Sequence, residues 1–529
     1  MGQFNLHTSL SPNLSNLISK YLDGDSELRD LYKYTPDVDG LKMAAKGRAD
    51  YPVDRELLVK VLKEQSQQSE YTTQESLAHI DRLSDPDVFT VTTGHQCCLF
   101  GGPMYFIYKI ISVIRLAQIA EENGVKAVPI FWMATEDHDF EEINHCWVGS
   151  QKLSWESAQT GAVGRFDLKE LEPVLGELQT LFKYQDEKIE LVNKIKQIYS
   201  SQKTLAQATR DLCSFLFGKT GLVILNADAP ALKMQFRDSI RAELVECISL
   251  GPVTKTSERL REMNLTTQVN PRSINLFWLD GGVRTRIERA GSDFKTADNT
   301  LSWSAGELLE LVDTSPERFS PNVILRPVYQ EQVLPNLAYV GGPGELSYAL
   351  QLRSMFETHG TFFPMLVLRD MALIMSRSSV EKLEKLGITV EDFKMDYHQL
   401  EAEITRKHGS HESLVDDPEK RIEELLDKIQ DDLKGFDETL GQSAETEKKR
   451  IIKRLEVLKK KVLKADKRHH QEELNTLRNI ADEIFPGGVP QERMMNWLTF
   501  IDSVDQFTDH LSPHFNPFDQ KMKVFISDK

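Results

Sequence analysis

Several short apolar runs along the chain have the length and character of β-strands. They lie at 88–94, 126–134, 221–228 and 363–374. After its first residue, Lys126, the run at 126–134 is continuously apolar, which is typical of a strand covered on both faces of a sheet. An apolar helical pattern from Met104 to about Glu122 follows the first run and ends at Asn123-Gly124, a common helix end. Strand, loop, helix and strand form a βαβ unit, so the pattern predicts an α/β fold with a parallel sheet.

Two stretches between these runs have a different pattern. Residues 150–220 are more polar and mostly helical. Residues 265–300 contain alternating apolar and polar positions around Asp280-Gly281-Gly282, which is a turn signal between two strands. We therefore expect helices in the first stretch and β-hairpins in the second.

The pattern changes again near Thr389. Residues 390–480 contain one proline, few aromatic residues and many charges, and apolar positions recur at spacings of four and three. This heptad seam predicts two long antiparallel helices or one broken rod, with a polar break at 441–447. The seam must be buried against its own return helix, a second subunit, or both. Its residues are Ile422, Leu426, Ile429, Leu433, Phe436 and Leu440, then Ile451, Leu455, Leu458 and Val462.

Composition narrows the class of protein. The chain has 529 residues, 40% of them hydrophobic, and a net charge of −17. This suits a soluble protein with several domains, and the negative charge argues against a broad nucleic-acid surface or an anionic membrane partner. No apolar run is long enough to span a bilayer, and the start lacks a secretory signal pattern. Five sparse cysteines without a spacing ladder indicate reduced thiols in a cytoplasm.

The loop TTGHQCCLFGGP, residues 92–103, contains the first candidate chemistry. It joins a predicted strand to a predicted helix, so backbone N–H groups at the helix start suit an anion or a phosphate. Its glycine spacing matches neither a P-loop nor a dinucleotide fingerprint. The adjacent thiols of Cys97 and Cys98 raise two alternatives, a metal site or a redox pair.

A cluster of carboxylates and histidines, ATEDHDFEEINH at 134–145, directly follows a buried run. Ligands of open α/β sheets bind at the carboxyl ends of the strands, so we expect a site here. If this segment were helical, His138, Glu142 and His145 would share a face and could ligate a divalent metal. One or two carboxylates are expected to cap the next helix. We interpret the others as catalytic or substrate-orienting groups.

The segment AYVGGPGELSYALQL, residues 338–352, repeats the order strand, glycines, helix. Two such loops in one sheet would face each other across a crevice, and a tight strand-to-helix turn is the alternative explanation. The stretch before it, from 322, predicts another strand. Arginines at strand ends suit carboxylates or phosphates, and the candidates are Arg272, Arg284, Arg326 and Arg369.

Together these motifs resemble the cysteine-adding enzyme family of bacillithiol biosynthesis. The resemblance spans nearly the whole chain in the same order, and it includes the late coiled coil and the Gln-Glu-Arg at 491–493. It rests on VTTGHQCCLFGGPMYFIYKI, VPIFWMATEDHDFEEINH, GLVILNADAPALK, INLFWLDGGVRTRIE, NVILRPVYQEQVLPNLAYVGGPGELSYALQL and FPMLVLRD.

The resemblance implies a Rossmann-like parallel-sheet core with inserted connecting segments, and a long antiparallel α-helical coiled coil that mediates homodimerisation. We accordingly expect the core at 1–385, with inserts at about 150–220 and 240–310. The coiled-coil domain is expected at 386–480, and a C-terminal segment at 481–529 is expected to pack back on the core.

The resemblance also implies the last step of bacillithiol synthesis, which joins L-cysteine through an amide to the amine of glucosaminyl malate. An amide formed from a free carboxylic acid must be driven, so ATP is the expected co-substrate, and no tightly bound metal is expected. The two carboxylates of the malate would bind arginines and helix N-termini. We expect catalytic roles for Glu136, Asp137, His138 and Asp139.

The residues expected to bind substrate lie in or beside the same motifs. In the family pattern, position 95 is His or Gln and the two thiols are not required. We therefore expect His95 to bind substrate together with Gln96 instead of transferring a proton. The expected binding residues are Gly94, His95, Gln96, Gly102, Pro103, Tyr105, Asn144, Arg326, Tyr339, Gly341, Gly342, Gly344, Glu345 and Arg369.

Two other classes of protein stay open. One is a metal-dependent hydrolase that uses the Asp/His cluster at 136–145, and the other is a non-catalytic coiled-coil scaffold. The convergent polar residues beside the glycine loops argue against a scaffold. A further motif, MSRSS at 375–379, is similar to the phosphate loop of class I aminoacyl-tRNA synthetases, although so short a motif often matches by chance.

Overall fold

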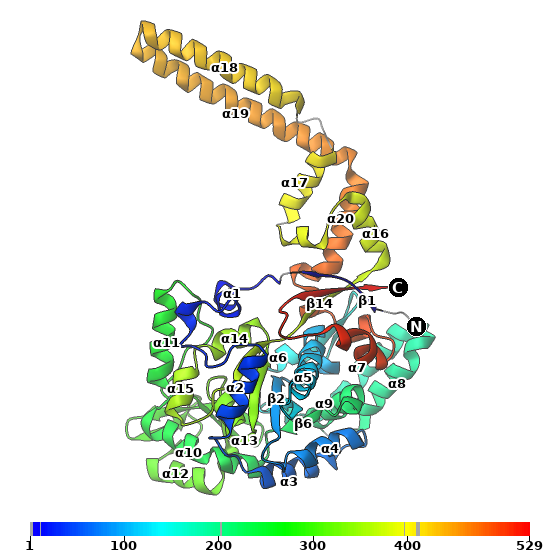
Figure 1. The fold of residues 1–529 in the computed structure, drawn as a ribbon, viewed down its shortest axis with the longest axis vertical. Helices are drawn as coiled ribbons and strands as arrows, with labels where there is room; N and C mark the ends of the chain where they lie inside the picture. Colours follow the sequence, from blue (N-terminus) through cyan, green and yellow to red (C-terminus); the bar gives the residue numbers. More distant parts are fainter. Residues whose placement is uncertain (1–3, 11, 202–203, 396, 409–412, 529) are drawn as a thin grey trace. The chain divides into compact units, whose positions relative to one another are not determined.

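The computed structural model describes residues 4–10, 12–201, 204–395, 397–408 and 413–528. These residues form two compact units, drawn in Figure 1. The first unit lies within 1–374 and 491–529, and the second within 375–490. The chain thus leaves the first unit after Ile374 and re-enters it at Gln491. The sequence predicts the corresponding boundaries at 385/386 and 480/481.

A five-stranded sheet forms the centre of the first unit, and all its strands run parallel in the order β13-β12-β2-β3-β6. Strands β3 and β12 are buried along their whole length, as strands covered on both faces are. The predicted parallel-sheet core is confirmed. Its strands are β2 (Phe89–His95), β3 (Ala127–Met133), β6 (Val223–Asn226), β12 (Asn336–Gly341) and β13 (Met365–Leu368).

The strand order reverses between β2 and β12. From β2 the chain continues through β3 to β6 on one side, and it later adds β12 and β13 on the other side. In open α/β sheets such a reversal leaves a crevice at the carboxyl ends of the two neighbouring strands. Gly94 and His95 end β2, and Gly341 ends β12, so two of the predicted glycine motifs meet at this crevice.

Helix α5 (Met104–Glu122) follows β2 and ends before Asn123, as the apolar pattern predicts. Most of its side chains are buried, because the helix packs into two of the hydrophobic core clusters. A helix that is apolar nearly all round is a core helix. Lys109 is the exception, since it is charged and yet only 3% exposed. A buried lysine requires a partner, and this partner lies at the crevice.

The segment between β3 and β6 is helical, as predicted for 150–220, and begins with a small hairpin. The helix α9 that closes it starts with a capping box formed by Thr204 and Gln207. The elements are α6 (Phe140–Ile143), β4 (His145–Val148), β5 (Gln151–Ser154), α7 (Glu172–Phe182), α8 (Asp186–Ser201) and α9 (Leu205–Phe217).

The segment between β6 and β12 adds two helices and then an antiparallel sheet of order β10-β9-β8-β7-β11. The predicted hairpin around Gly281-Gly282 is the β7–β8 connection. The elements are α10 (Pro230–Glu246), α11 (Leu250–Glu262), β7 (Leu276–Asp280), β8 (Val283–Ala290), β9 (Asp293–Thr296), β10 (Ser302–Trp303), α12 (Ala305–Thr314) and β11 (Phe319–Pro321).

The N-terminal region is mostly helical, and the first strand pairs with the last one. Strand β1 (Phe4–Leu10) pairs antiparallel with β15 (Met522–Ser527). These two strands form a three-stranded sheet with β14 (Met371–Ser376), which follows β13. The helices of this region are α1 (Asn16–Leu22), α2 (Val38–Arg48), α3 (Arg55–Ser66) and α4 (Gln74–Arg82).

Two local predictions are wrong. The run at 363–374 is not one strand, because it breaks after Leu368 and continues as β14 in another sheet. The stretch from 322 is not a strand either. The side chain of Asn322 accepts the backbone N–H groups of the residues at 324 and 325, and helix α13 (Arg326–Val333) starts directly afterwards. Arg326 therefore lies at a helix start.

Helices α14 (Pro343–Ala349), α15 (Arg353–Thr358) and α21 (Gln491–Met494) complete this unit.

The second unit is helical, and the predicted pair of long antiparallel helices is confirmed. Lys448 contacts Asp427, and Lys459 contacts Asp416, so α18 and α19 run in opposite directions. The break lies at Asp437, whose carboxylate caps the start of α19, and not at the predicted 441–447. The helices are α16 (Arg377–Leu386), α17 (Tyr397–His408), α18 (Ser413–Phe436), α19 (Glu438–His469) and α20 (Gln471–Ile484).

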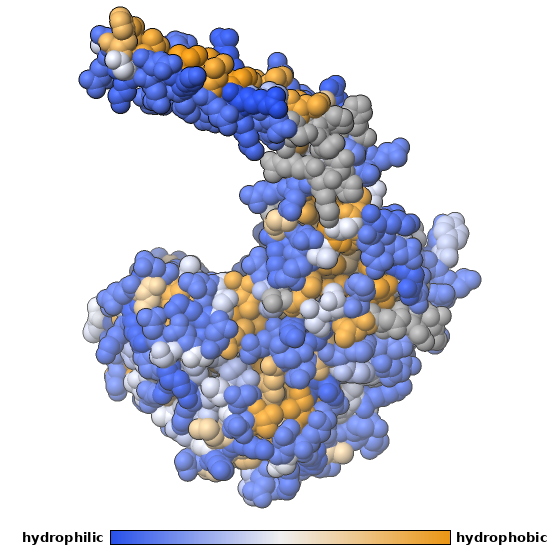
Figure 2. Space-filling view, turned by 45° about the horizontal axis from the view of Figure 1, so that its top comes forward, coloured by the Kyte–Doolittle hydropathy of each residue, from blue (hydrophilic) through white to orange (hydrophobic). Residues whose placement is uncertain are grey.

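A hydrophobic stripe runs along the hairpin of α18 and α19, as Figure 2 shows. Its exposed members include Leu425, Ile429, Phe436, Leu440, Val457 and Leu458. Within the described ranges, no helix is both long and apolar enough to cross a bilayer.

Candidate active site

A cavity of about 750 Å³ opens at the carboxyl ends of β2, β3 and β12. This size is typical of small-molecule sites, and the location is the crevice where the strand order reverses. The hairpin β7–β8 contributes Phe277 and Arg284 to the wall, and the re-entering segment contributes Arg493. One side of the cavity, beside β2 and β12, is rich in cations. The other side, after β3, is rich in carboxylates.

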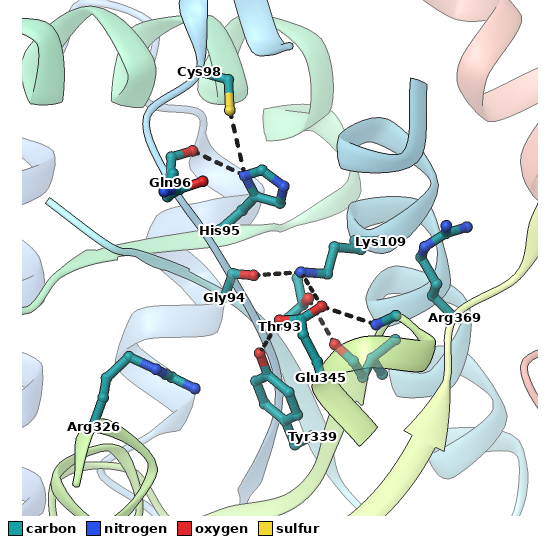
Figure 3. A network of polar contacts seen from close by, with 12 residues as sticks. Thr93, Gly94, His95, Gln96, Cys98, Lys109, Arg326, Tyr339, Glu345 and Arg369 are labelled. Atoms are coloured by element: carbon teal, nitrogen blue, oxygen red, sulfur yellow. Dashed lines mark hydrogen bonds and ion pairs between the residues drawn. The ribbon is translucent and has the colours of Figure 1, made fainter. Parts of the chain in front are cut away.

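A buried ion pair holds the ends of β2 and β12 together (Figure 3). Nζ of Lys109 lies 2.5 Å from Oε2 of Glu345 and donates to the carbonyl oxygen of Gly94 at 2.7 Å. Oε1 of Glu345 accepts the hydroxyl of Tyr339 at 2.6 Å. Burial by itself would raise the pKa of Glu345, but Lys109 and the N–H of Gly342 outweigh it and lower that pKa to about 2. Glu345 is therefore an anion.

The second glycine loop is occupied by its own glutamate. Helix α14 starts with a capping box in which Oε2 of Glu345 accepts the N–H of Gly342 at 2.9 Å. The prediction that this helix start binds a substrate anion is therefore wrong, because the carboxylate of Glu345 already accepts the N–H of Gly342. A Cβ atom at Gly341 would lie 2.8 Å from the side chain of Leu346, so glycine is required there by close packing. Gly342 and Gly344 line the cavity.

His95 lies in the cavity wall beside two aromatic rings. Its ring centroid is 5.2 Å from that of Tyr105 and 5.1 Å from that of Phe106. Burial, followed by the charge of Lys109, lowers the pKa of His95 to about 3, so the ring is neutral near pH 7. Nδ1 donates to the carbonyl oxygen of Gln96 at 3.1 Å, which leaves Nε2 as an acceptor. A neutral ring of this kind suits the expected binding role.

Arg369 directly follows β13, as predicted, and its charge is already neutralised. Nη1 and Nη2 donate to the two carboxylate oxygens of Glu492 at 3.0 and 2.6 Å, in bidentate geometry. The backbone N–H of Arg369 donates to the carbonyl oxygen of Gly341 at 2.9 Å, which fixes the position of the arginine beside the crevice. Burial alone would lower the pKa of Arg369, and the carboxylate of Glu492 raises it.

Arg326 lacks such a partner, since no carboxylate of the described residues lies within ion-pair distance of it. Nη1 donates to Oε1 of Gln330 at 3.0 Å, and the guanidinium lies 5.5 Å from the ring centroid of Tyr339. Burial opposes the charge, but Tyr339 and Tyr348 keep the pKa of Arg326 above its ordinary value. Arg326 thus presents a positive charge that an incoming anion can neutralise.

Glu136, on the other side of the cavity, pairs with a buried lysine. Its Oε1 lies 2.5 Å from Nζ of Lys233, and its Oε2 accepts the hydroxyl of Ser320 at 3.1 Å. Lys233 is fully buried and also donates to the carbonyl oxygen of Phe319. Burial raises the pKa of Glu136 in spite of the nearby ammonium. A cavity carboxylate with a raised pKa is suited to proton transfer.

Asp137 has the opposite character, although it is the next residue. It accepts Nε2 of Gln96 at 2.8 Å and the backbone N–H of His138 at 2.7 Å. Burial opposes ionisation, but the hydrogen bonds from Gln96 and from the backbone N–H of His138, together with the charge of Arg284, lower the pKa of Asp137 well below its usual range. Gln96 also donates to Oε2 of Glu142 at 3.0 Å, so it joins the loops that follow β2 and β3.

His138 is held by the hairpin β7–β8. Nη1 of Arg284 donates to Nδ1 of His138 at 2.7 Å, and the guanidinium lies 4.0 Å from the ring centroid of Phe277. Nδ1 of His138 therefore acts as an acceptor, and the tautomer has its proton on Nε2. Asp139 also lines the cavity, so all four predicted catalytic residues lie in its wall.

Four of the residues expected to bind substrate do not line the cavity: Gly102, Pro103, Asn144 and Gly341. The anion site predicted at the start of α5 is covered by the C-terminal segment. The carbonyl oxygen of Met495 accepts the N–H of Met104 at 2.8 Å, and Nδ2 of Asn496 donates to the carbonyl oxygen of Gly102 at 2.7 Å. The N–H of Met104 is therefore already bonded within the protein, and the adjacent backbone is packed against the C-terminal segment.

The alternative in which 138–145 forms one helix is not what the structure has. Helix α6 is only four residues long, His138 precedes it and His145 begins β4, so the three candidate ligands do not share a helix face. In the part of the chain that the structure describes, no group of three or more His, Cys, Asp or Glu side chains is placed to hold a metal ion. Cys97 and Cys98 are buried free thiols, and burial raises the pKa of Cys97 to about 12.

The motif at 375–379 is the start of a capped helix in the second unit. Oγ of Ser376 accepts the N–H of Ser379 at 3.2 Å, and Oε1 of Glu483 accepts the N–H of Ser376 at 2.6 Å. A carboxylate thus occupies the place where a phosphate would bind. The resemblance to a synthetase phosphate loop has no support in this geometry.

Sequence reasoning missed Lys109, Lys233 and Arg493. Lys109 gave a signal, since it is a single charge inside the apolar pattern at 104–114. Lys233 and Arg493 gave none, because each lies in an ordinary polar context and far along the chain from the residues it joins at the cavity.

A doubly wound parallel sheet, a charged cavity at its reversal point and a separate helical hairpin define a Rossmann-like α/β protein with a coiled-coil unit. The family described as "Bacillithiol biosynthesis BshC, N-terminal Rossmann-like domain" matches residues 3–370. The one described as "Bacillithiol biosynthesis BshC, C-terminal coiled-coil domain" matches residues 372–526. The chain belongs to the BshC family.

Similar proteins span the same length. Two curated relatives, from Cytophaga hutchinsonii and Flavobacterium psychrophilum, are 36% and 37% identical to this chain, and the matches cover 96% and 95% of it and 95% of each relative. A third, from Bacillus mycoides, is 27% identical over 97% of this chain and 98% of its own length. All three are named "Putative cysteine ligase BshC".

Proposed function

We propose that this protein is a ligase that forms an amide between the carboxyl group of L-cysteine and the amine of glucosaminyl malate, with ATP driving the reaction. The names of the relatives support a ligase that uses cysteine. The observation that carries the proposal is the division of one cavity into a cationic side and an acidic side. A substrate with an amine at one end and a dicarboxylate at the other matches this division.

The charges of the cavity give the substrate one orientation. A carboxylate of the malate binds to Arg326, whose guanidinium has no carboxylate partner among the described residues and offers charge-assisted hydrogen bonds. The amine then points toward Glu136 and Asp137 on the acidic side. His95 and Gln96 lie at the end of β2, which stands between β12 and β3 in the sheet, and a neutral acceptor and an amide suit the hydroxyl groups of a sugar.

The chemistry assigns different roles to the two carboxylates. Once ATP has converted the cysteine carboxyl into a mixed anhydride with a phosphate group, the amine attacks the acyl carbon. The C–N bond forms, the C–O bond to the phosphate group breaks, and a proton leaves the amine. We assign Glu136 as the base that accepts this proton, since burial raises its pKa. Asp137, with its lowered pKa, stays ionised and attracts the ammonium form of the substrate.

The proposal is tested by incubating the purified protein with cysteine, glucosaminyl malate and ATP. Mass spectrometry should detect the amide product, and nucleotide analysis should show whether ADP or AMP forms. No product with any nucleotide would overturn the assignment as a ligase.

The role of the base is tested in the same assay. Glu136→Gln should lower kcat at least about 100-fold, since a general base contributes a factor of that order. Glu258 is exposed and does not line the cavity, so Glu258→Gln is the matched control and should keep wild-type activity. A Glu136→Gln variant with unchanged kcat would remove Glu136 from this role and leave the ligase assignment standing.

A further inference from the structure

The sequence Gln-Glu-Arg at 491–493 marks the point where the chain re-enters the first unit, and its three side chains are directed to three different tasks. Gln491, where the chain re-enters the first unit, bonds to Ile374, where the chain leaves it. Its Nε2 donates to the carbonyl oxygen of Ile374 at 2.8 Å, and its Oε1 accepts the N–H of Ile374 at 3.0 Å. A side-chain amide that pairs with both the N–H and the C=O of one residue holds the backbone as a neighbouring strand would.

Glu492 removes one arginine from the set that can bind substrate. It is 9% exposed and forms the bidentate pair with Arg369, which is 4% exposed. A buried arginine that already shares both of its terminal nitrogens with a carboxylate has little left to offer to a second one. Arg369 therefore contributes to the shape of the cavity wall more than to its open charge.

Arg493 is placed differently, although it is the next residue. It is exposed, it lines the cavity, and no carboxylate of the described residues lies within ion-pair distance of it. Its backbone position is set two residues later, where Met495 and Asn496 bond to the start of α5. The backbone of Arg493 is thus held in place, and its guanidinium group faces the cavity without a carboxylate partner among the described residues.

The cations of the cavity can be divided by their partners. Among the described residues, five Lys or Arg side chains line it. Lys109 faces Glu345, Arg369 faces Glu492, and Arg284 lies 4.0 Å from Asp137. Within the described ranges, the two without a carboxylate partner are Arg326 and Arg493.

We propose that Arg493 binds a second carboxylate of the substrate while Arg326 binds the first, so that the site selects a dicarboxylate over a monocarboxylate. This inference rests on the proposed function, since it assigns the two carboxylates of the malate group to two named arginines. It also gives the Gln-Glu-Arg sequence a role in substrate recognition.

Calorimetric binding of L-malate and L-lactate to the full-length protein tests this inference, because lactate has a methyl group where malate has a carboxymethyl group with the second carboxylate. The wild-type protein should bind malate about tenfold more tightly than lactate, a factor that one charged hydrogen bond supplies. Arg493→Gln should bind both acids equally, with the Kd for lactate unchanged. Arg493→Lys keeps the charge and should retain part of the preference.

Arg272 provides the matched control, since it is exposed and does not line the cavity. Arg272→Gln should keep the wild-type preference for malate. A wild-type protein without this preference, or an Arg493→Gln variant that keeps it, would overturn the role of Arg493.

The two proposals fail separately. If the wild-type protein forms the amide product and Arg493→Gln leaves KM for glucosaminyl malate unchanged, the role of Arg493 is wrong and the ligase assignment stands. If the wild-type protein forms no product but Arg493→Gln abolishes the preference for malate, the dicarboxylate site stands and the proposed reaction is wrong.

Discussion

His95 shows how the surroundings of one residue decide what its side chain can do. A histidine next to two thiols and near a carboxylate cluster is a candidate for a metal ligand or a proton carrier. Burial and the charge of Lys109 instead lower the pKa of His95 to about 3. The ring is therefore neutral across the range in which enzymes usually work. The neutral ring of His95 can still form hydrogen bonds, and an amide side chain can form them as well.

Replacement of His95 by glutamine should accordingly leave the reaction largely intact. We expect His95→Gln to change kcat by less than about tenfold, well below the factor of 100 or more that general acid–base catalysis contributes. The pH profile of kcat/KM between pH 6 and 9 should keep its shape, because no titrating group is removed in that range. The measurement is steady-state kinetics of the amide-forming reaction.

His359 gives the control for this substitution, since it is a part-buried histidine with a lowered pKa that does not line the cavity. A shifted pH profile in His95→Gln, with His359→Gln unchanged, would mean that His95 does transfer a proton.

Among the elements, the hairpin of α18 and α19 is the one whose apolar residues are least covered. Residues of the predicted heptad seam, such as Leu426 and Leu455, are only partly buried, and others are exposed. Leu425 is 58% exposed and Leu458 is 46% exposed. Contiguous exposed apolar surface of this kind indicates an interaction site. The return helix thus covers the seam in part, and a second copy of the chain would cover the remainder.

We therefore predict that the protein is a homodimer and that this stripe forms the interface. Leu425→Glu, Ile429→Glu and Leu458→Glu together should convert the dimer to a monomer, because each places a charge in the apolar contact. Light scattering after size-exclusion chromatography measures the mass directly.

The control adds the same three charges to exposed polar positions of the same hairpin, through Gln442→Glu, Ser443→Glu and Thr446→Glu. This variant should stay dimeric. A wild-type protein that is already monomeric, or a triple apolar variant that remains a dimer, would exclude this interface.

At the scale of the whole molecule, a buried chain of hydrogen bonds connects the cavity to the centre of the sheet. Arg326 donates to Gln330, and Nε2 of Gln330 donates to Oε1 of Glu331 at 2.9 Å. Nδ2 of Asn336 donates to the same oxygen at 2.8 Å, and its Oδ1 accepts the hydroxyl of Thr92 at 2.9 Å. Both β2 and β12 are thus linked to the helix α13 that begins with Arg326.

Glu331 makes the stability of the fold depend on pH. Burial raises its pKa to about 7, although the charges of Arg48 and Arg326 and two hydrogen bonds oppose this shift. The unfolded chain would titrate near the ordinary value of about 4.3. Because the pKa of Glu331 is raised in the folded state, its protonated form contributes to the free energy of unfolding. This contribution is complete below about pH 4 and is lost as the pH rises through 7.

The test compares the wild-type protein with Glu331→Gln, whose amide does not titrate. Between pH 5 and 7, the unfolding free energy of the wild-type protein relative to the variant should fall with a slope of up to about 1.4 kcal/mol per pH unit. Urea unfolding at several pH values measures it. Glu258 is exposed, so the curve of unfolding free energy against pH for Glu258→Gln should run parallel to the wild-type curve. A parallel curve for Glu331→Gln would show that Glu331 titrates normally.

Prediction from the sequence succeeded where a local pattern is sufficient. The start and end of α5 are correct because an apolar helix between a loop and an Asn-Gly end has few alternatives. The cluster from Glu136 to Asp139 lies in the cavity wall, as expected for residues after a buried strand. Gly102 and Pro103 do not, because the segment that covers them, Met495 and Asn496, comes from the other end of the chain.

By itself, the sequence determined the parallel sheet, the long helical hairpin and the edge of the sheet where charged residues gather, since each depends on periodicity or on residue order. Only the tertiary structure decided which charges are open to a substrate. Lys109, Arg369 and Glu136 are all paired, whereas Arg326 and Arg493 face no carboxylate among the described residues. The physical reason is that burial and opposite charge set the state of an ionisable group, and both come from residues distant along the chain.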